Sequence, residues 1–267
     1  MVIGIVSALL VLGVLGLAFG AVLGVADKKF HVETDPRVDQ VRACLGGANC
    51  GACGFAGCDA FAEAVVSGEA KPNGCPAGGE AAAVAIGEIM GVAVEAVEPM
   101  VARVICQGTH GVAKERYTYD GLKSCRVAAG MAGGPKECRF ACIGLGDCMN
   151  HCAFHAISIV DGIAHIDESL CKGCGTCVET CPRSVIQLRP VDAPVLVRCR
   201  NSDVARVARS VCMKACIGCG RCTKECKYGA IQVENGFARI DLDKCTRCGE
   251  CAKVCPCNCI TVQGESE

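Results

Sequence analysis

The spacing of the cysteines constrains this chain more than any other feature. The sequence holds 27 cysteines in 267 residues, and many of them fall in runs of the form C-x-x-C-x-x-C-x-x-x-C. A disulfide scaffold this rich in cysteine is usually short and secreted, whereas this chain is long and its count is odd. Because converging thiolates at this spacing are typical ligands of iron–sulfur cubanes, the runs predict [4Fe-4S] clusters. A zinc ribbon offers two C-x-x-C pairs instead.

Three of the runs are complete. In the bacterial ferredoxin arrangement, three cysteines of one run hold a cubane and the fourth binds the other cluster. The C-terminal part of the chain therefore predicts one cluster on Cys216, Cys219, Cys222 and Cys255. It predicts a second cluster on Cys226, Cys245, Cys248 and Cys251. The remaining complete run predicts a cluster on Cys171, Cys174, Cys177 and the more distant Cys152.

One run has lost a ligand. The segment from Cys142 to Cys148 aligns with the segment from Cys216 to Cys222, and Leu145 stands where the middle cysteine should be. Cys138 lies four residues before Cys142 and is the natural substitute. The spacing thus predicts a cluster on Cys138, Cys142, Cys148 and Cys181.

A further cluster is predicted near the N-terminus. Its expected ligands lie among glycines, which let the backbone approach a cluster and donate N–H groups to the sulfurs. These ligands are Cys50, Cys53, Cys58 and Cys75. The sequence therefore predicts five clusters.

A sixth cluster is an open alternative. Two matched pairs of cysteines precede the two C-terminal repeats and could together hold a cubane: Cys106, Cys125, Cys199 and Cys212. The other interpretation is four buried thiols, since free cysteine packs as a small hydrophobe. Cys138 and Cys212 align with each other between the repeats, so the duties of these cysteines could be exchanged. Cys44, Cys257 and Cys259 are interpreted as structural.

The N-terminal segment predicts a membrane anchor. Residues 2–26 contain no charged side chain, and at about 1.5 Å per residue they would form a helix of roughly 38 Å, long enough for a bilayer core. Lys28 and Lys29 follow directly, which by the positive-inside rule places the rest of the chain in the cytoplasm. Reduced thiols agree with that location. We therefore expect a single-pass protein of the cell (inner) membrane.

The organisation predicts an α+β fold in four parts. These are a transmembrane helix (1–26), a small helical 4Fe-4S domain (27–100) and two tandem bacterial-ferredoxin-like modules (101–190 and 191–267). The modules are internal repeats, because residues 157–167 and 231–241 both alternate apolar residues around Asp-Gly or Asn-Gly. Each segment predicts a β-hairpin. Residues 81–97 predict a helix.

The charge pattern suggests a docking surface. A formal net charge of −1 gives no sign of nucleic-acid binding. Basic residues nevertheless gather around the C-terminal clusters, where they would attract an acidic electron carrier such as soluble ferredoxin. The candidates are Arg206, Arg209, Lys214 and Arg221. An ordinary solvated basic face is the alternative.

The whole chain resembles one known family, the B subunit of the Rnf complex. The resemblance rests on the N-terminal apolar helix, the segment from Asn49 to Cys58 with Cys75-Pro76, and the ferredoxin modules that follow. It implies an electron-transfer subunit of an ion-translocating ferredoxin:NAD oxidoreductase. Such a protein would take electrons from ferredoxin and work with membrane and peripheral partner subunits. The Cys50 set would pass electrons to the membrane subunits.

Two other functions remain open, and direct NAD chemistry is not expected. No G-x-G-x-x-G or P-loop pattern occurs, so the chain should lack a nucleotide site of its own. One alternative is an electron-transfer subunit of a different membrane oxidoreductase. The other is an iron–sulfur sensor or scaffold, although a sensor needs one cluster and not a series.

Overall fold

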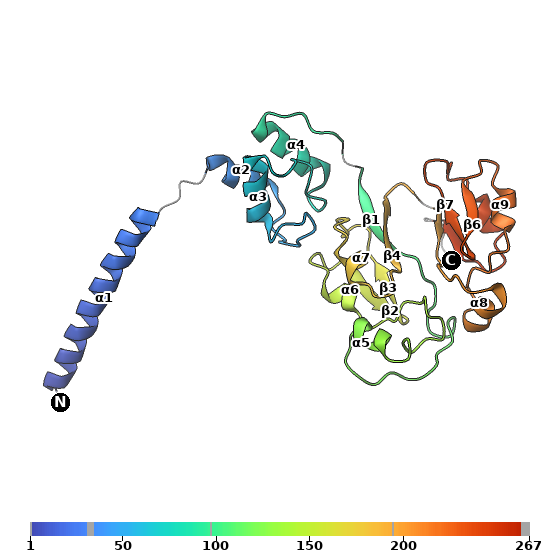
Figure 1. Cartoon of the computed structure of the whole chain (residues 1–267), viewed down its shortest axis with the longest axis horizontal. Coiled ribbons are helices and arrows are strands. Elements are labelled where there is room, and N and C mark those ends of the chain that lie inside the picture. The colour runs from blue at the N-terminus through green and yellow to red at the C-terminus, as the bar shows by residue number, and fades with distance from the viewer. Residues whose placement is uncertain (1, 31–34, 97, 194, 263–267) are drawn as a thin grey trace.

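The computed structural model describes residues 2–30, 35–96, 98–193 and 195–262. Within the first helix, the side chains of residues 2–9, 27, 28 and 30 lie outside this description. That helix, α1 (Val2–Phe30), precedes the rest of the chain as a separate rod (Figure 1). Over the residues described, no helix combines the length and the apolar character needed to cross a membrane. The predicted anchor thus falls partly on side chains outside the description.

A three-helix domain follows. Its helices are α2 (Pro36–Cys44), α3 (Cys58–Ser67) and α4 (Gly79–Met90). Apolar side chains from all three helices form its core, including Val41, Phe61 and Ile86, and thiols pack around them. The predicted helix over 81–97 is wrong at its C-terminal end. Gly91 adopts the left-handed conformation with φ of 67° and caps α4, because glycine carries no side chain to oppose it.

The rest of the chain contains the same arrangement twice. The first repeat contains β1 (Met100–Val104), α5 (Cys125–Gly130), α6 (Asp147–Asn150), β2 (Ile157–Val160), β3 (Ile163–Ile166), α7 (Thr176–Thr180) and β4 (Ile186–Pro190). The second repeat contains β5 (Val195–Val197), α8 (Ala205–Val211), α9 (Arg221–Glu225), β6 (Ile231–Glu234), β7 (Phe237–Ile240), α10 (Glu250–Lys253) and β8 (Ile260–Val262). We call these the first and second modules. Short helices and antiparallel two-stranded sheets agree with the α+β prediction.

Each module contains a hairpin and a sheet that joins its two ends. β2 pairs with β3 and β6 pairs with β7, which confirms both predicted hairpins. The central turn residues Asp161-Gly162 and Asn235-Gly236 all have positive φ, as a tight hairpin turn requires. β1 pairs with β4 and β5 with β8, so the first and last strands of each module lie together.

Glycines let each cysteine loop close onto a hairpin turn. Gly144 has φ of +83°, and a Cβ atom there would collide with the carbonyl of Gly162. Gly218 occupies the same place in the second module, with φ of +62° and the carbonyl oxygen of Gly236 at 2.9 Å from an ideal Cβ. Each loop therefore needs glycine, both for its conformation and for this close approach.

The two modules are joined by backbone and side-chain contacts. The amide of Lys114 donates to the carbonyl of Val211 at 2.9 Å, and the amide of Met213 donates to the carbonyl of Val112 at 3.0 Å. Ala113, Ala208 and Ala215 form a small buried cluster with Cys212 at this junction. The segments that precede the cysteine runs of the two modules are thereby brought together.

Candidate metal centres

Three pockets of nearly equal size are each lined by a quartet of candidate cysteine ligands, and Cys257 and Cys259 also line the pocket of Cys216. The open volumes of the three pockets are about 320, 340 and 350 Å³. In the second module they hold Cys216, Cys219, Cys222 and Cys255, which we call the second near set, and Cys226, Cys245, Cys248 and Cys251, the second far set. Both quartets are those predicted from the spacing. Three pockets of similar size, each with converging thiols, are suited to the same cofactor, a [4Fe-4S] cubane.

The third pocket brings together a different quartet from the one predicted for the first module. Its four cysteines are Cys125, Cys142, Cys148 and Cys181, which we call the first near set. Cys125 therefore stands where the spacing predicted Cys138. Leu145, which stands at the position of the missing ligand, packs against the buried cluster that contains Cys125.

Hydrogen bonds explain how Cys125 reaches this pocket. The carboxylate of Asp147, in the first turn of α6, accepts the Ser124 hydroxyl at 3.1 Å and the Arg126 amide at 3.0 Å. This carboxylate holds the N-terminus of α5 against α6. As a result Cys125 and Cys148, which follow Ser124 and Asp147, face the same hollow. A ligand supplied through such a contact has no regular spacing in the sequence.

Two further quartets contain the cysteines that spacing predicts. Cys177 lies among the thiols of Cys152, Cys171 and Cys174, and we call these four the first far set. In the helical domain, the thiols of Cys50, Cys53 and Cys58 act on Cys75. A backbone donor reaches the first far set, since the amide of Ala102 lies 3.4 Å from the Cys171 sulfur. Such donors stabilise thiolate ligands.

A sixth quartet lies between the modules. Cys138 interacts with Cys106, Cys199 interacts with Cys138, and Cys212 interacts with both Cys106 and Cys138. The exposed fractions of Cys106, Cys138 and Cys212 are only 8%, 7% and 9%. We call these four the bridging set. In this grouping Cys138 lies where the prediction placed Cys125, and Cys125 lies where it placed Cys138.

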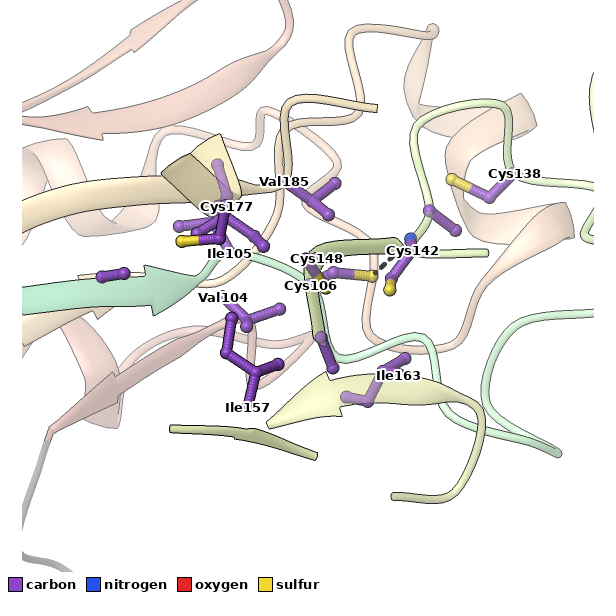
Figure 2. Close-up of a cluster of buried hydrophobic side chains, with 14 residues drawn as sticks. Val104, Ile105, Cys106, Cys138, Cys142, Cys148, Ile157, Ile163, Cys177 and Val185 are labelled. Carbon is purple, nitrogen blue, oxygen red and sulfur yellow. Dashed lines mark hydrogen bonds between the residues drawn. The ribbon is translucent and has the colours of Figure 1, made fainter. Parts of the chain in front are cut away.

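The bridging set has an internal symmetry that follows the repeat. The Cys106 sulfur accepts the amide of Cys142 at 3.4 Å, as the dashed line in Figure 2 shows. The Cys199 sulfur accepts the amide of Cys216 at 3.2 Å. Gly108 and Asn201, two residues after Cys106 and Cys199, also donate their amides to those sulfurs, at 3.3 and 3.5 Å. Each module thus contributes an equivalent half of the site.

The alignment of the repeats contained the signal for this exchange. Cys138 lies four residues before Cys142, and Cys212 lies four residues before Cys216. Equivalent positions in two repeats are expected to serve the same site. Asn201, whose side-chain nitrogen lies 3.6 Å from the Cys138 sulfur and which is 1% exposed, was not among the predicted site residues. A single asparagine carries no spacing signal.

The quartets follow one another in a row. Cys148 of the first near set interacts with Cys177 of the first far set. Cys222 and Cys251 connect the near and far sets of the second module in the same way. The bridging set touches both near sets through the backbone contacts of Cys106 and Cys199. Five quartets therefore form a continuous series across the two modules.

Burial keeps many of these thiols protonated until a cluster binds. Desolvation raises the pKa of Cys148 to about 12, and repulsion by Cys142 adds to this. Desolvation also raises the pKa of Cys177 and of Cys199 to about 12. Because only thiolates bind iron, cluster assembly must release protons at these sites.

Cys257 and Cys259 also line the pocket of the second near set, and Cys259 contacts its ligands. The Cys259 sulfur lies 3.5 Å from that of Cys255, and the Cys259 side chain is 1% exposed. Hydrogen bonds from Cys259 lower the pKa of Cys216 and lower that of Cys255 to about 5. A protonated Cys259 thus favours the thiolate form of two ligands.

The predicted basic residues lie on the second module, which also carries exposed thiols. Arg206 and Arg209 on α8 are exposed, Arg221 is exposed at the start of α9, and Lys214 is half-buried. Cys219 and Cys248 are the exposed thiols in the described part of the chain.

No three His, Cys, Asp or Glu side chains among the described residues are placed to hold a single metal ion.

Family comparisons match the segments that carry these quartets. A putative Fe-S cluster family covers residues 45–77, a 4Fe-4S binding domain covers 164–187, and a 4Fe-4S dicluster domain covers 215–259. Together with the repeated fold and the thiol quartets, these matches define an iron–sulfur electron-transfer protein with several 4Fe-4S clusters.

The chain belongs to the family formed by the B subunits of ion-translocating ferredoxin:NAD oxidoreductase complexes. It is 48% identical over 252 residues to the B subunit of the Na(+)-translocating complex of Acetobacterium woodii, covering 94% of this chain and 76% of that protein. It is 40% identical over 239 residues to the B subunit of the proton-translocating complex of Clostridium ljungdahlii, covering 89% and 84%. The B subunit of the ion-translocating oxidoreductase complex of Methanosarcina acetivorans is 40% identical over 241 residues, covering 90% and 91%.

Proposed function

We propose that this chain carries electrons from reduced ferredoxin through six [4Fe-4S] clusters toward the membrane subunits of an ion-translocating ferredoxin:NAD oxidoreductase. The observation that carries the proposal is the continuous row of five thiol quartets across the modules. Each cluster would accept one electron and pass it on. Neighbouring quartets that lie within electrostatic reach of one another suit such a relay, whereas a sensor would not need a series.

The second module is the proposed input end. Its exposed Cys219 and Cys248 would bring two clusters close to the surface, where an external carrier could reach them. Electrons would then pass from the second module through the bridging set to the first module. The cluster on the Cys50 set of the helical domain would be the last one before electrons reach the partner subunits.

The reaction with NAD is assigned to another component of the complex. The sequence has no glycine-rich phosphate loop, so this chain would relay electrons without binding NAD. Its own residues would bind and insulate the clusters and receive the ferredoxin.

Charge reversal on α8 tests the ferredoxin input. With the full chain in detergent, Arg206→Glu together with Arg209→Glu should slow oxidation of reduced ferredoxin about tenfold or more at low salt. Both residues are exposed, and the charge of Arg209 reaches Cys257 beside the second near set. Stopped-flow absorbance measures the rate, and the native rate should fall steeply as salt is added.

A matched double variant controls for net charge. Lys71→Glu with Lys123→Glu makes the same change at exposed positions in the helical domain and first module, and should leave the rate within about twofold. Equal rates for the wild type and the α8 variant at low salt would contradict docking at this surface.

We further propose that α1 anchors the chain in the cell membrane, with the iron–sulfur domains on the cytoplasmic side. Support comes from the uncharged stretch at residues 2–26 and from apolar side chains that lie unburied, such as Leu17 at 78% and Phe19 at 66% exposure. Buried in lipid, these side chains would bind the membrane strongly. Alkaline carbonate extraction should leave the chain in the membrane pellet, and its release into the supernatant would contradict the anchor.

A further inference from the structure

A large crevice lies between the two modules, away from the pockets described above. It has an open volume of about 830 Å³ and is bordered by β4, β5 and β7. Three arginines line it: Arg189 from β4, Arg239 from β7, and Arg200 from the segment that follows β5. Phe237 and Cys199 also form part of its wall. Among the described residues that line the crevice there is no aspartate or glutamate.

The positive charge of Arg189 is poorly compensated. Arg189 is half-buried, and its guanidinium donates to the neutral side-chain oxygen of Gln187 at 2.8 Å. Its Nε atom is buried without a hydrogen-bond partner in the described part of the chain. Burial, followed by repulsion from Arg103 and Arg239, lowers the pKa of Arg189. A buried charge that lacks a counter-charge is costly.

The contacts of the other two arginines do not neutralise the positive charge of the crevice. Arg200 donates to the backbone carbonyls of Arg183 and Ser184, at 3.2 and 2.5 Å, which orders the side chain without neutralising it. Arg239 lies over the Phe237 ring and 4.0 Å from Glu234, at the limit of an ion pair, and that pair is more than half exposed. The crevice thus holds several guanidinium groups and few negative ones.

We propose that this crevice binds an oxyanion with two or more negative charges, held by Arg189 and Arg239 and steadied by Arg200. Guanidinium groups bind phosphate and carboxylate oxygens through paired, charge-assisted hydrogen bonds. The buried Nε–H of Arg189 has no hydrogen-bond partner in the described part of the chain. The ligand's shared chemistry is a phosphoryl group or a dicarboxylate, and the proposal does not depend on the electron route.

Titration calorimetry on the full cluster-loaded chain in detergent tests the site. Inorganic phosphate, pyrophosphate and succinate are the three probes, at fixed ionic strength in chloride. We expect saturable binding of one anion per chain for at least one probe. The phosphates binding more tightly would identify a phosphoryl ligand, and succinate binding more tightly would identify a dicarboxylate.

Two variants and a control complete the test. Arg189→Gln and Arg239→Gln should each weaken binding by about 10- to 100-fold, the loss of a hydrogen bond to a charged group. Lys227→Gln removes one exposed charge elsewhere on the second module and should not change the affinity. Visible absorbance of the clusters verifies that each variant is intact. Absence of saturable binding to any probe, or equal affinity in Arg189→Gln and Lys227→Gln, would overturn the proposal.

Because Cys199 of the bridging set lines the same crevice, binding has a second readout. An anion there would oppose the extra negative charge of a reduced cluster and shift one midpoint potential downward. Unchanged potentials at saturating anion would contradict binding beside Cys199.

Discussion

Cys138→Ser should remove one complete cluster, about four irons per chain, and adding Cys106→Ser should remove no more. Cys106 and Cys138 interact within the bridging set, so loss of either ligand disables the same site. In the six-cluster alternative predicted from spacing, the two cysteines serve different clusters, and the double variant would lose about eight irons. The iron content per chain, measured on anaerobically purified protein, distinguishes these two assignments of the cysteines.

A second double variant, in the first near set, tests the same grouping from the other side. Cys125 and Cys142 line one pocket, so Cys125→Ser with Cys142→Ser should also lose about four irons. Cys44→Ser is the control, since its thiol donates to the Gln40 carbonyl at 3.4 Å and lies outside all the quartets. A loss of about eight irons from either double variant would contradict the exchange of Cys125 and Cys138.

Lys136→Met should be among the most damaging substitutions outside the cysteines. Lys136 is 4% exposed, and its ammonium donates to the carbonyls of Gly108 and Gly162, both at 2.7 Å. These acceptors are neutral, and the nearby acidic groups on which its charge acts are Cys142 and Cys212. Bound clusters would therefore supply its counter-charge. Removing one partner of a buried charge pair costs about 3–5 kcal/mol.

The measurements are the thermal midpoint of the cluster-loaded chain and the potentials from an EPR redox titration. Lys136→Met should lower the thermal midpoint and shift at least one cluster potential downward, because a nearby positive charge favours the reduced cluster. Lys136→Arg keeps the charge and should retain the potential even if packing suffers. Potentials unchanged in Lys136→Met would contradict an electrostatic role.

The parts of the fold that follow local rules were predictable from the sequence. Tight turns at Asp161-Gly162 and Asn235-Gly236 fix each hairpin within a few residues, and the alternating apolar pattern sets its register. The complete cysteine runs are equally local, because three ligands come from one short loop. The quartets of the second module accordingly match the prediction.

The ligand exchange could not be predicted from spacing, because it depends on contacts between distant segments. Cys125 reaches Cys148 only because the Asp147 carboxylate binds the Ser124 hydroxyl and the Arg126 amide. Cys138 is four residues from Cys142, yet it faces the other module. Proximity along the chain favoured grouping Cys138 with Cys142, whereas equivalence to Cys212 in the other repeat favours the grouping that the structure shows.

Two other features arise from tertiary structure. The helix α4 ends at Met90, although its apolar pattern continues, because Gly91 takes a left-handed conformation. The arginine-lined crevice forms where β4 of one module faces β7 of the other. Arg189 and Arg239 are 50 residues apart in the sequence, with no shared motif that would reveal their proximity.

Iron and acid-labile sulfide per chain, measured on the full chain purified without oxygen, test the account most directly. Six quartets predict about 24 irons and about 24 sulfides, since each cubane holds four of each. About 20 of each would mean that the bridging set holds no cluster and that the two modules are not connected by one. Zinc in place of iron and sulfide would contradict the electron relay altogether.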